Sequence, residues 1–179
     1  LLNLDSIAKA VAILTHPKGR GLSHRRITLS TCGLCDGMYK LADGDLDIRL
    51  AVSLTVADEK LRELLMPVTK AHPLSELRKA IRYFNTKKRK RVTLELVLLK
   101  GINTTREAAR QLAAFVRGLE VHINLIPWNP VQGLPYERPA DAEVRVLYSA
   151  LVQYGLNVTV RQKRGQTIGG ACGQLGKKG

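Results

Sequence analysis

The stretch Val92-Thr93-Leu94-Glu95-Leu96-Val97-Leu98 has the apolar and β-branched composition of a β-strand. The sequence Thr104-Thr105-Arg106-Glu107 then opens a helix that should run to about Arg117. A second strand is expected at His122-Ile123-Asn124-Leu125-Ile126-Pro127. A helix between two strands is a βαβ unit, whose strands lie parallel and whose crossover is right-handed. This stretch therefore predicts an α/β fold.

The same alternation extends toward both ends of the chain. Further strands are expected at Arg26–Thr31, Ile48–Leu54 and Asn157–Arg161. Further helices are expected at Asp5–Leu14, Asp36–Leu41, Ala57–Leu65, Ser75–Phe84 and Asp141–Tyr154. We therefore expect strands and helices to alternate throughout, around one parallel sheet.

The length of the chain, 179 residues, suits one domain with a core, so we treat 1–179 as a single domain. Three cysteines cannot form a closed disulfide framework, which favours a reducing cytoplasmic location. The first stretch, Leu1 to Thr15, is interrupted by polar residues and resembles neither a signal peptide nor a membrane span. We expect no membrane partner.

The formal charge of +14 comes from 29 Lys and Arg residues against 15 Asp and Glu residues. Such a charge attracts polyanions, so nucleic acid is the expected partner class. Aromatic residues make up only 4% of the chain, which argues against a single-strand platform built on base stacking. The basic run Lys87-Lys88-Arg89-Lys90-Arg91 could be either a solvated loop or an RNA-contacting patch.

Polar residues collect where the predicted strands end. Ser30-Thr31, Ser53-Leu54-Thr55, Asn103 and Asn129 each lie at or just after a strand. The carboxyl ends of parallel strands meet at one edge of a sheet, where α/β proteins place their active sites. Together these groups could hold a polar cofactor by hydrogen bonds. Taken singly, each could instead be a helix cap or a turn residue.

Cys172 lies between glycines in Gly169-Gly170-Ala171-Cys172-Gly173-Gln174-Leu175, after the basic run Arg161-Gln162-Lys163-Arg164. Nearby cations lower the pKa of a thiol and make it a better nucleophile, although a lone cysteine in a tail can also be inert. The pair Cys32 and Cys35 has zinc-knuckle spacing, but a tetrahedral site needs two more ligands. We therefore interpret that pair as structural and predict no metal site within the chain. The sequence contains no complete Ser/His/Asp set and no phosphate-binding Gly-rich loop.

These residues together resemble the RlmN/Cfr-like radical S-adenosylmethionine methyltransferases, which modify an adenine in RNA. The segments that carry the resemblance are spread over the whole chain. They are Leu1–Asp5, Arg25–Thr31, Ala51–Leu54, Ile123–Pro130 and Ala171–Leu175.

The resemblance implies a fold, a cofactor site and a mechanism. The fold would be the last four βα units of a (β/α)6 barrel, followed by a C-terminal strand and a catalytic-loop tail. Residues matching the family's S-adenosylmethionine contacts are Ser30, Ser53, Leu54, Thr55 and Asn129. Cys172 would be the methyl carrier: its thiolate takes a methyl group from one S-adenosylmethionine, and a radical from a second activates it. The resemblance leaves open whether the adenine lies in 23S rRNA, in tRNA or in both, and whether C2 or C8 is methylated; we expect C2, the commoner activity among relatives.

The sequence departs from the family pattern in ways that matter for activity. The family binds a 4Fe-4S cluster through a C-x3-C-x2-C motif, which this sequence lacks. We therefore expect a C-terminal portion of such an enzyme, inactive alone, with the cluster ligands in a preceding segment and an electron donor such as flavodoxin. Thr55 stands where relatives commonly have His. The competing hypothesis is a basic, non-catalytic RNA-binding or ribosome-associated α/β module.

Overall fold

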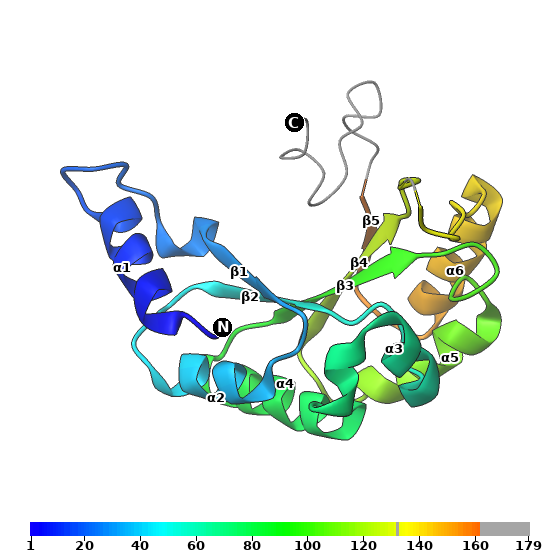
Figure 1. Ribbon diagram of the computed structural model, residues 1–179, viewed down its shortest axis with the longest axis horizontal. Helices are drawn as coiled ribbons and strands as arrows, with labels where there is room; N and C mark the ends of the chain where they lie inside the picture. Colours follow the sequence, from blue (N-terminus) through cyan, green and yellow to red (C-terminus); the bar gives the residue numbers. More distant parts are fainter. Residues whose placement is uncertain (132, 162–179) are drawn as a thin grey trace.

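A computed structural model of the protein describes residues 1–131 and 133–161. At its centre is a five-stranded sheet in which every neighbouring pair of strands is parallel. The strands follow in chain order: β1 (Thr28–Thr31), β2 (Arg49–Ser53), β3 (Val92–Leu98), β4 (Val121–Pro127) and β5 (Val158–Val160). All carboxyl ends therefore lie at one side of the sheet, which we call the carboxyl edge (Figure 1).

The helices gather mainly on one face of the sheet. They are α1 (Leu4–Thr15), α2 (Cys35–Asp43), α3 (Glu59–Leu65), α4 (Leu74–Lys88), α5 (Arg106–Val116) and α6 (Asp141–Gln153), with short 3-10 turns η1 (His24–Arg26) and η2 (Pro67–Lys70). Helices α2 to α5 cover this face, whereas no helix of the described residues lies over the opposite face of β2 and β3 (Figure 1). We call that opposite face the helix-free face.

The burial of β3 shows how the sequence separates the two faces. Leu94, Leu96 and Leu98 are buried in the core that β3 shares with the helices. Their neighbours Thr93 and Glu95 are half-buried and point to the other side. Side chains alternate along a strand, so the Leu residues pack under the helices while the polar residues remain on the helix-free face.

The structure confirms the predicted α/β fold and the order of its elements. The main difference is α4, which continues beyond the predicted end at Phe84 to Lys88. Its last turn is held from outside, because Lys87 pairs with Asp43 at 3.6 Å and Lys88 donates to the carbonyl of Gly44. Hydrophobic periodicity cannot predict this extension of α4, because the contacts that hold it come from residues distant in the sequence. No helix within the described ranges is long and apolar enough to cross a membrane.

Candidate functional site

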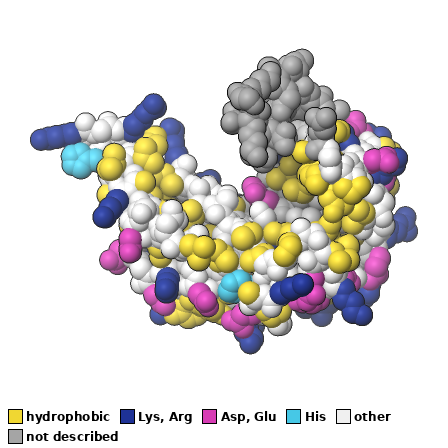
Figure 2. All heavy atoms as spheres, viewed as in Figure 1, with side chains coloured by type: hydrophobic (Ala, Val, Ile, Leu, Met, Phe, Trp, Pro, Cys, Tyr) yellow, Lys and Arg dark blue, Asp and Glu magenta, His cyan; other side chains and the backbone are white. Residues whose placement is uncertain are grey.

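Ser30 and Ser53 lie near the carboxyl ends of the neighbouring strands β1 and β2. Ser30 is in register with Ala51, so Ser53 stands two residues farther along β2 and on the same face. Ser53 is paired with Glu95 of β3, which places both serines on the helix-free face. Ser30 is exposed and Ser53 is half-buried. Figure 2 shows that the molecular surface is hollowed on this side.

The chain turns sharply after β2, at Leu54 and Thr55. Their backbone N–H groups both donate to the carbonyl of Glu95, at 3.0 and 3.2 Å. Thr55 has a φ of 62°, in the left-handed region that β-branched residues rarely adopt. The Leu54 side chain is fully buried and only 8% of Thr55 is exposed. The carbonyls of Leu54 and Thr55 also have partners, because they accept hydrogen bonds from Arg62 and Asn103, so the backbone of this turn is fixed by the protein itself.

Asn103, which the sequence grouped with the polar strand ends, is a structural residue. It is 3% exposed, and its amide nitrogen donates to the carbonyls of Thr55 and Val97 at 3.0 and 2.7 Å. Its side-chain oxygen accepts the N–H of Leu99 at 2.8 Å. The amide thus joins the end of β2 to the end of β3. The expectation that Asn103 offers its amide to a shared site is wrong.

Asn129 follows β4 and is held by an arginine. Nη1 of Arg138 donates to Oδ1 of Asn129 and to the carbonyl of Trp128, both at 3.2 Å. The N–H of Trp128 donates to the carbonyl of Leu98 at 3.1 Å, which joins the segment after β4 to the end of β3. Nε1 of Trp128 is buried and has no partner among the described residues. A buried indole N–H normally has an acceptor, so this one could serve a bound molecule.

The helix-free face carries more polar groups than sequence reasoning found. One cross-strand row is polar on four adjacent strands, from β2 to β5: Ser53, Glu95, Asn124 and Thr159. Beside it, the ring nitrogens of His122 lie 2.9 Å from Oδ1 of Asn157 and 2.9 Å from Oγ1 of Thr159. The signal that could have identified Glu95 and Asn124 is their polar character within otherwise apolar strands.

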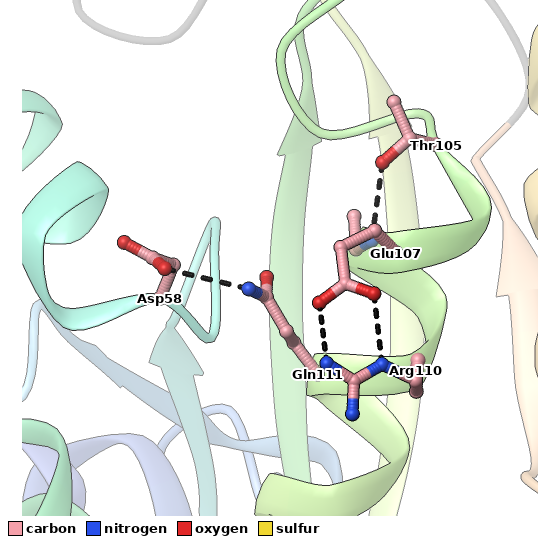
Figure 3. A network of polar contacts seen from close by, with 6 residues as sticks. Asp58, Thr105, Glu107, Arg110 and Gln111 are labelled. Atoms are coloured by element: carbon pink, nitrogen blue, oxygen red, sulfur yellow. Dashed lines mark hydrogen bonds and ion pairs between the residues drawn. The ribbon is translucent and has the colours of Figure 1, made fainter.

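Figure 3 shows how the loop after β2 is fixed to α5. Asp58 caps the start of α3, and its other oxygen accepts a hydrogen bond from Nε2 of Gln111 at 3.4 Å. Thr105 caps α5, as the sequence predicted, and Glu107 forms two hydrogen bonds with Arg110. Both caps satisfy helix N–H groups that otherwise lack partners. The loop that follows Thr55 is thus fixed to α5 through Asp58 and Gln111.

The three cysteines differ in what the structure reveals. Cys172 lies outside the described residues. Cys35 is buried, and burial, with help from Glu76 and Asp36, raises the pKa of its thiol to about 11. Cys32 is exposed. Within the described part of the chain, no three His, Cys, Asp or Glu side chains are grouped so that they could hold a metal ion.

Three grooves lie near the carboxyl edge but are separate from the two serines. One of about 870 Å³ lies along α6 and includes Arg106 and Tyr154. Another, of about 780 Å³, lies between α6 and β5 and includes Arg138 and Arg161. The third, of about 290 Å³, separates the Thr55 turn from α5. None of these three grooves is lined by Ser30 or Ser53.

Comparison with known proteins shows where this arrangement recurs. Over 98% of its length the chain is 60% identical to a protein of Treponema denticola named "Probable dual-specificity RNA methyltransferase RlmN". A protein with the same name from Thermus thermophilus is 43% identical over 99% of the chain. The chain is thus similar over nearly its whole length to RlmN proteins. The resemblance drawn from the sequence is thereby confirmed.

A solved structure agrees with the RlmN assignment. The radical SAM methyltransferase of Sphaerobacter thermophilus superposes with a TM-score of 0.93 and is 38% identical over 97% of the chain. The chain spans about half of these relatives, namely 51% of the Treponema denticola protein, 50% of the Thermus thermophilus protein and 51% of the solved chain. No protein-family model matches the sequence.

Proposed function

We propose that the intact protein is a radical S-adenosylmethionine RNA methyltransferase and that this chain supplies part of its cofactor site and its methyl-carrying cysteine. The observation that carries the proposal is the similarity of nearly the whole chain to RlmN proteins, which reaches 60% identity with the Treponema denticola protein. The polar groups at the carboxyl edge support it, because that edge is where parallel α/β folds bind ligands.

The residues at the carboxyl edge fit S-adenosylmethionine. Ser30 and Ser53 offer hydroxyl groups and Asn129 offers an amide, while Leu54 and Thr55 form the fixed turn beside Ser53. The buried, unpartnered Nε1 of Trp128 is a further donor beside this set. Neutral donors and acceptors of this kind suit a cofactor with ribose, adenine and amino-acid parts.

The residues of this chain do not fit a 4Fe-4S cluster. Such a cluster is held by thiolates gathered at one place, and the family spaces three of them as C-x3-C-x2-C, whereas the cysteines of this sequence are Cys32, Cys35 and Cys172. Cys32 and Cys35 are adjacent to one helix start, and the buried Cys35 has a raised pKa that favours the neutral thiol. We therefore expect the chain alone to be inactive, with the cluster ligands supplied by the rest of the intact protein.

In the proposed mechanism Cys172 is the nucleophile. Its thiolate would accept a methyl group and become S-methylcysteine, whose methyl group would lose a hydrogen atom to the radical and bond to the adenine through carbon. A partner cysteine in the rest of the intact protein would then form a disulfide with Cys172 and break the C–S bond. S-adenosylmethionine would supply the methyl group and, on reductive cleavage, the radical that activates it. The cations that precede Cys172 in the sequence favour the thiolate form that this role needs.

We propose RNA as the substrate, specifically C2 of an adenine in 23S rRNA and also in tRNA. The names of the relatives refer to RNA methyltransferase activity, and the charge of +14 suits a polyanionic partner. An electron donor such as flavodoxin and a cytoplasmic location complete the proposal.

Two substitutions in the full-length protein test the proposal. Cys172→Ala should abolish methyl transfer to RNA but leave the dissociation constant for S-adenosylmethionine nearly unchanged, because it removes a covalent step and no cofactor contact. Asn129→Ala should instead weaken cofactor binding by roughly 1 to 3 kcal/mol, because it removes a hydrogen-bonding partner and leaves Arg138 with the Trp128 carbonyl but without the Asn129 oxygen as acceptor.

The measurements are calorimetric binding of S-adenosylmethionine and radiolabel transfer to RNA under anaerobic conditions. Methyl transfer by Cys172→Ala would exclude the thiol carrier. A full-length protein that binds RNA but neither binds S-adenosylmethionine nor methylates would instead be the basic RNA-binding module considered above.

A further inference from the structure

Arg62 of α3 is the most unusual buried residue of the described structure. Its relative exposure is 0%, and burial lowers the pKa of its guanidinium. An arginine nevertheless stays charged at neutral pH, and a fully buried charge is costly unless it is well bonded. None of the ion pairs found among the described residues involves Arg62. The Glu59 carboxylate favours the charge from a distance, and the hydrogen bonds of the guanidinium go to neutral oxygens.

Those oxygens come from the ends of β1 and β2. Nε of Arg62 donates to the carbonyl of Leu54 at 3.2 Å. Nη2 donates to the carbonyls of Cys32 and Ser53, at 2.9 and 3.3 Å. Nη1 donates to Oγ1 of Thr69 at 2.7 Å. One side chain thus binds three carbonyls from two strands and is itself held by a hydroxyl in η2.

The position of these carbonyls explains why a guanidinium is needed. The register between β1 and β2 ends at the pair Thr31 and Val52. The next carbonyls, of Cys32 and Ser53, have left the ladder, so the two strand ends would separate without another donor. A planar fork with several N–H groups can join them, whereas a single ammonium cannot reach all three.

The neighbourhood is shaped to admit this fork. Gly33 has a φ of 104°, and a Cβ there would lie 3.2 Å from Nη2 of Arg62 and 3.3 Å from Leu77. Thr69 is 1% exposed, and its hydroxyl donates to the carbonyl of Met66 at 2.8 Å. That bond leaves its oxygen free to accept from Arg62. Three separate segments are therefore fitted around one side chain.

We propose that Arg62 is a positioning residue for the cofactor site: it fixes the strand ends that carry Ser30, Ser53 and Leu54. This inference rests on the proposed function, because it assigns those residues to S-adenosylmethionine. Arg62 itself does not need to touch the cofactor. It acts through the backbone at the point where sheet hydrogen bonding stops.

The first test compares full-length variants in calorimetric titration with S-adenosylmethionine and in thermal unfolding. Arg62→Met keeps an unbranched side chain, although a shorter one, and removes every donor, so it should raise the dissociation constant at least about tenfold. Arg62→Lys should fall between Arg62→Met and wild type. Val92→Ala is the matched core control, because Val92 is fully buried at the amino end of β3, away from the carboxyl edge. It should lower the melting temperature while changing the dissociation constant by less than about twofold.

The second test spares Arg62 and alters the residue that holds it. Thr69→Val removes the hydroxyl but keeps the shape, whereas Thr69→Ser keeps the hydroxyl. Thr69→Val should weaken binding of S-adenosylmethionine by about threefold or more, and Thr69→Ser should stay within about twofold of wild type. If Arg62→Met does not fold, these two Thr69 variants still test the positioning role of Arg62.

The outcomes separate this inference from the proposed function. Wild-type affinity in Arg62→Met, equal affinities in the Thr69 pair, or an equal loss of affinity in Val92→Ala would overturn the positioning role. If wild type bound no S-adenosylmethionine, the proposed function would fail instead. Hydrogen exchange would then still test Arg62, because the amides of Leu54 and Thr55 should exchange faster in Thr69→Val than in Thr69→Ser. Equal exchange would overturn the inference.

Discussion

At the scale of single residues, buried polar side chains set the geometry of the carboxyl edge. Asn103 joins β2 to β3, Arg62 joins β1 to β2, and Arg138 holds the segment after β4. Each bonds backbone carbonyls that the sheet ladder leaves unpaired. The polar character of the site therefore depends on residues that do not themselves face the hollow.

Asn103→Ala should lower the free energy of unfolding by about 3 kcal/mol, because it leaves the carbonyls of Thr55 and Val97 and the N–H of Leu99 without partners. Thr105→Ala is the matched control, since it removes an exposed helix cap nearby and should cost about 1 kcal/mol. Urea unfolding measures both changes. Equal losses in the two variants would show that the buried amide contributes no more than an ordinary cap.

The sequence could indicate which residues stand at strand ends but not which way they face. Ser53 and Asn103 are both polar residues near the end of an apolar strand. In the structure Ser53 is half-buried on the helix-free face, whereas Asn103 is buried and its amide is fully hydrogen-bonded within the protein. Arg62 gave no signal at all, because a charged residue in a short amphipathic helix normally lies on the surface. Its burial depends on Cys32, which is 30 residues away in the sequence, and on the conformation of η2, which brings Thr69 to the guanidinium.

At the scale of elements, α2 and α4 form a helix pair with a polar seam at its rim. The hydroxyl of Tyr39 donates to Oε1 of Glu76 at 2.7 Å, and the ring of Tyr39 meets that of Tyr83 edge to face at 5.2 Å. The bond from Tyr39 holds the pKa of Glu76 below its usual value, with a further contribution from Lys79. The pairing of the two helices is therefore linked to pH.

Tyr39→Phe should lower the melting temperature at pH 7 and have little effect at pH 3. The pKa of Glu76 is lowered in the folded state, so its contribution to stability is fully present above the unfolded value of 4.5 and is lost as pH falls. Thermal unfolding across this range measures the effect. In a Glu76→Gln background the pH dependence of the Tyr39→Phe effect should disappear. A pH-independent loss in both backgrounds would contradict this assignment.

The elements were the most predictable level of this protein. All five strands and six α-helices follow from hydrophobic periodicity and start signals such as Thr105, because apolar side chains and caps act locally. The two 3-10 turns were not predicted. The turn η2 begins at Pro67 and is stabilised by Thr69, whose hydroxyl bonds Met66 and Arg62, so its conformation depends on tertiary contacts.

At the scale of the whole molecule, the high positive charge is unevenly available to a partner. In the basic run at the end of α4, Lys87 and Lys90 pair with Asp43 and Asp47, and Lys88 bonds the carbonyl of Gly44. This run also lies at the amino end of β3, opposite the carboxyl edge. It therefore fits a solvated surface better than an RNA-contacting patch.

Replacing Arg161, Lys163 and Arg164 together by Ala should reduce the slope of log affinity for RNA against log salt by about 2, since each phosphate contact contributes roughly 0.7 to 0.9. Arg161 is exposed at the carboxyl edge, and the other two follow it in sequence, outside the described residues. The matched triple substitution of Lys87, Lys88 and Lys90 should change the slope by less than about 1. Equal changes would mean that RNA is bound by diffuse charge.

The chain-order arrangement of the strands also affects how the protein is made. Every strand from β2 to β5 pairs with the strand synthesised immediately before it. Each newly translated strand and its helix can therefore dock on a surface that has already left the ribosome, without waiting for a distant partner. We expect the strands from β1 to β5 to join the sheet in this order during translation, each serving as the template for the next, with the polar carboxyl edge completed only when β4 has joined.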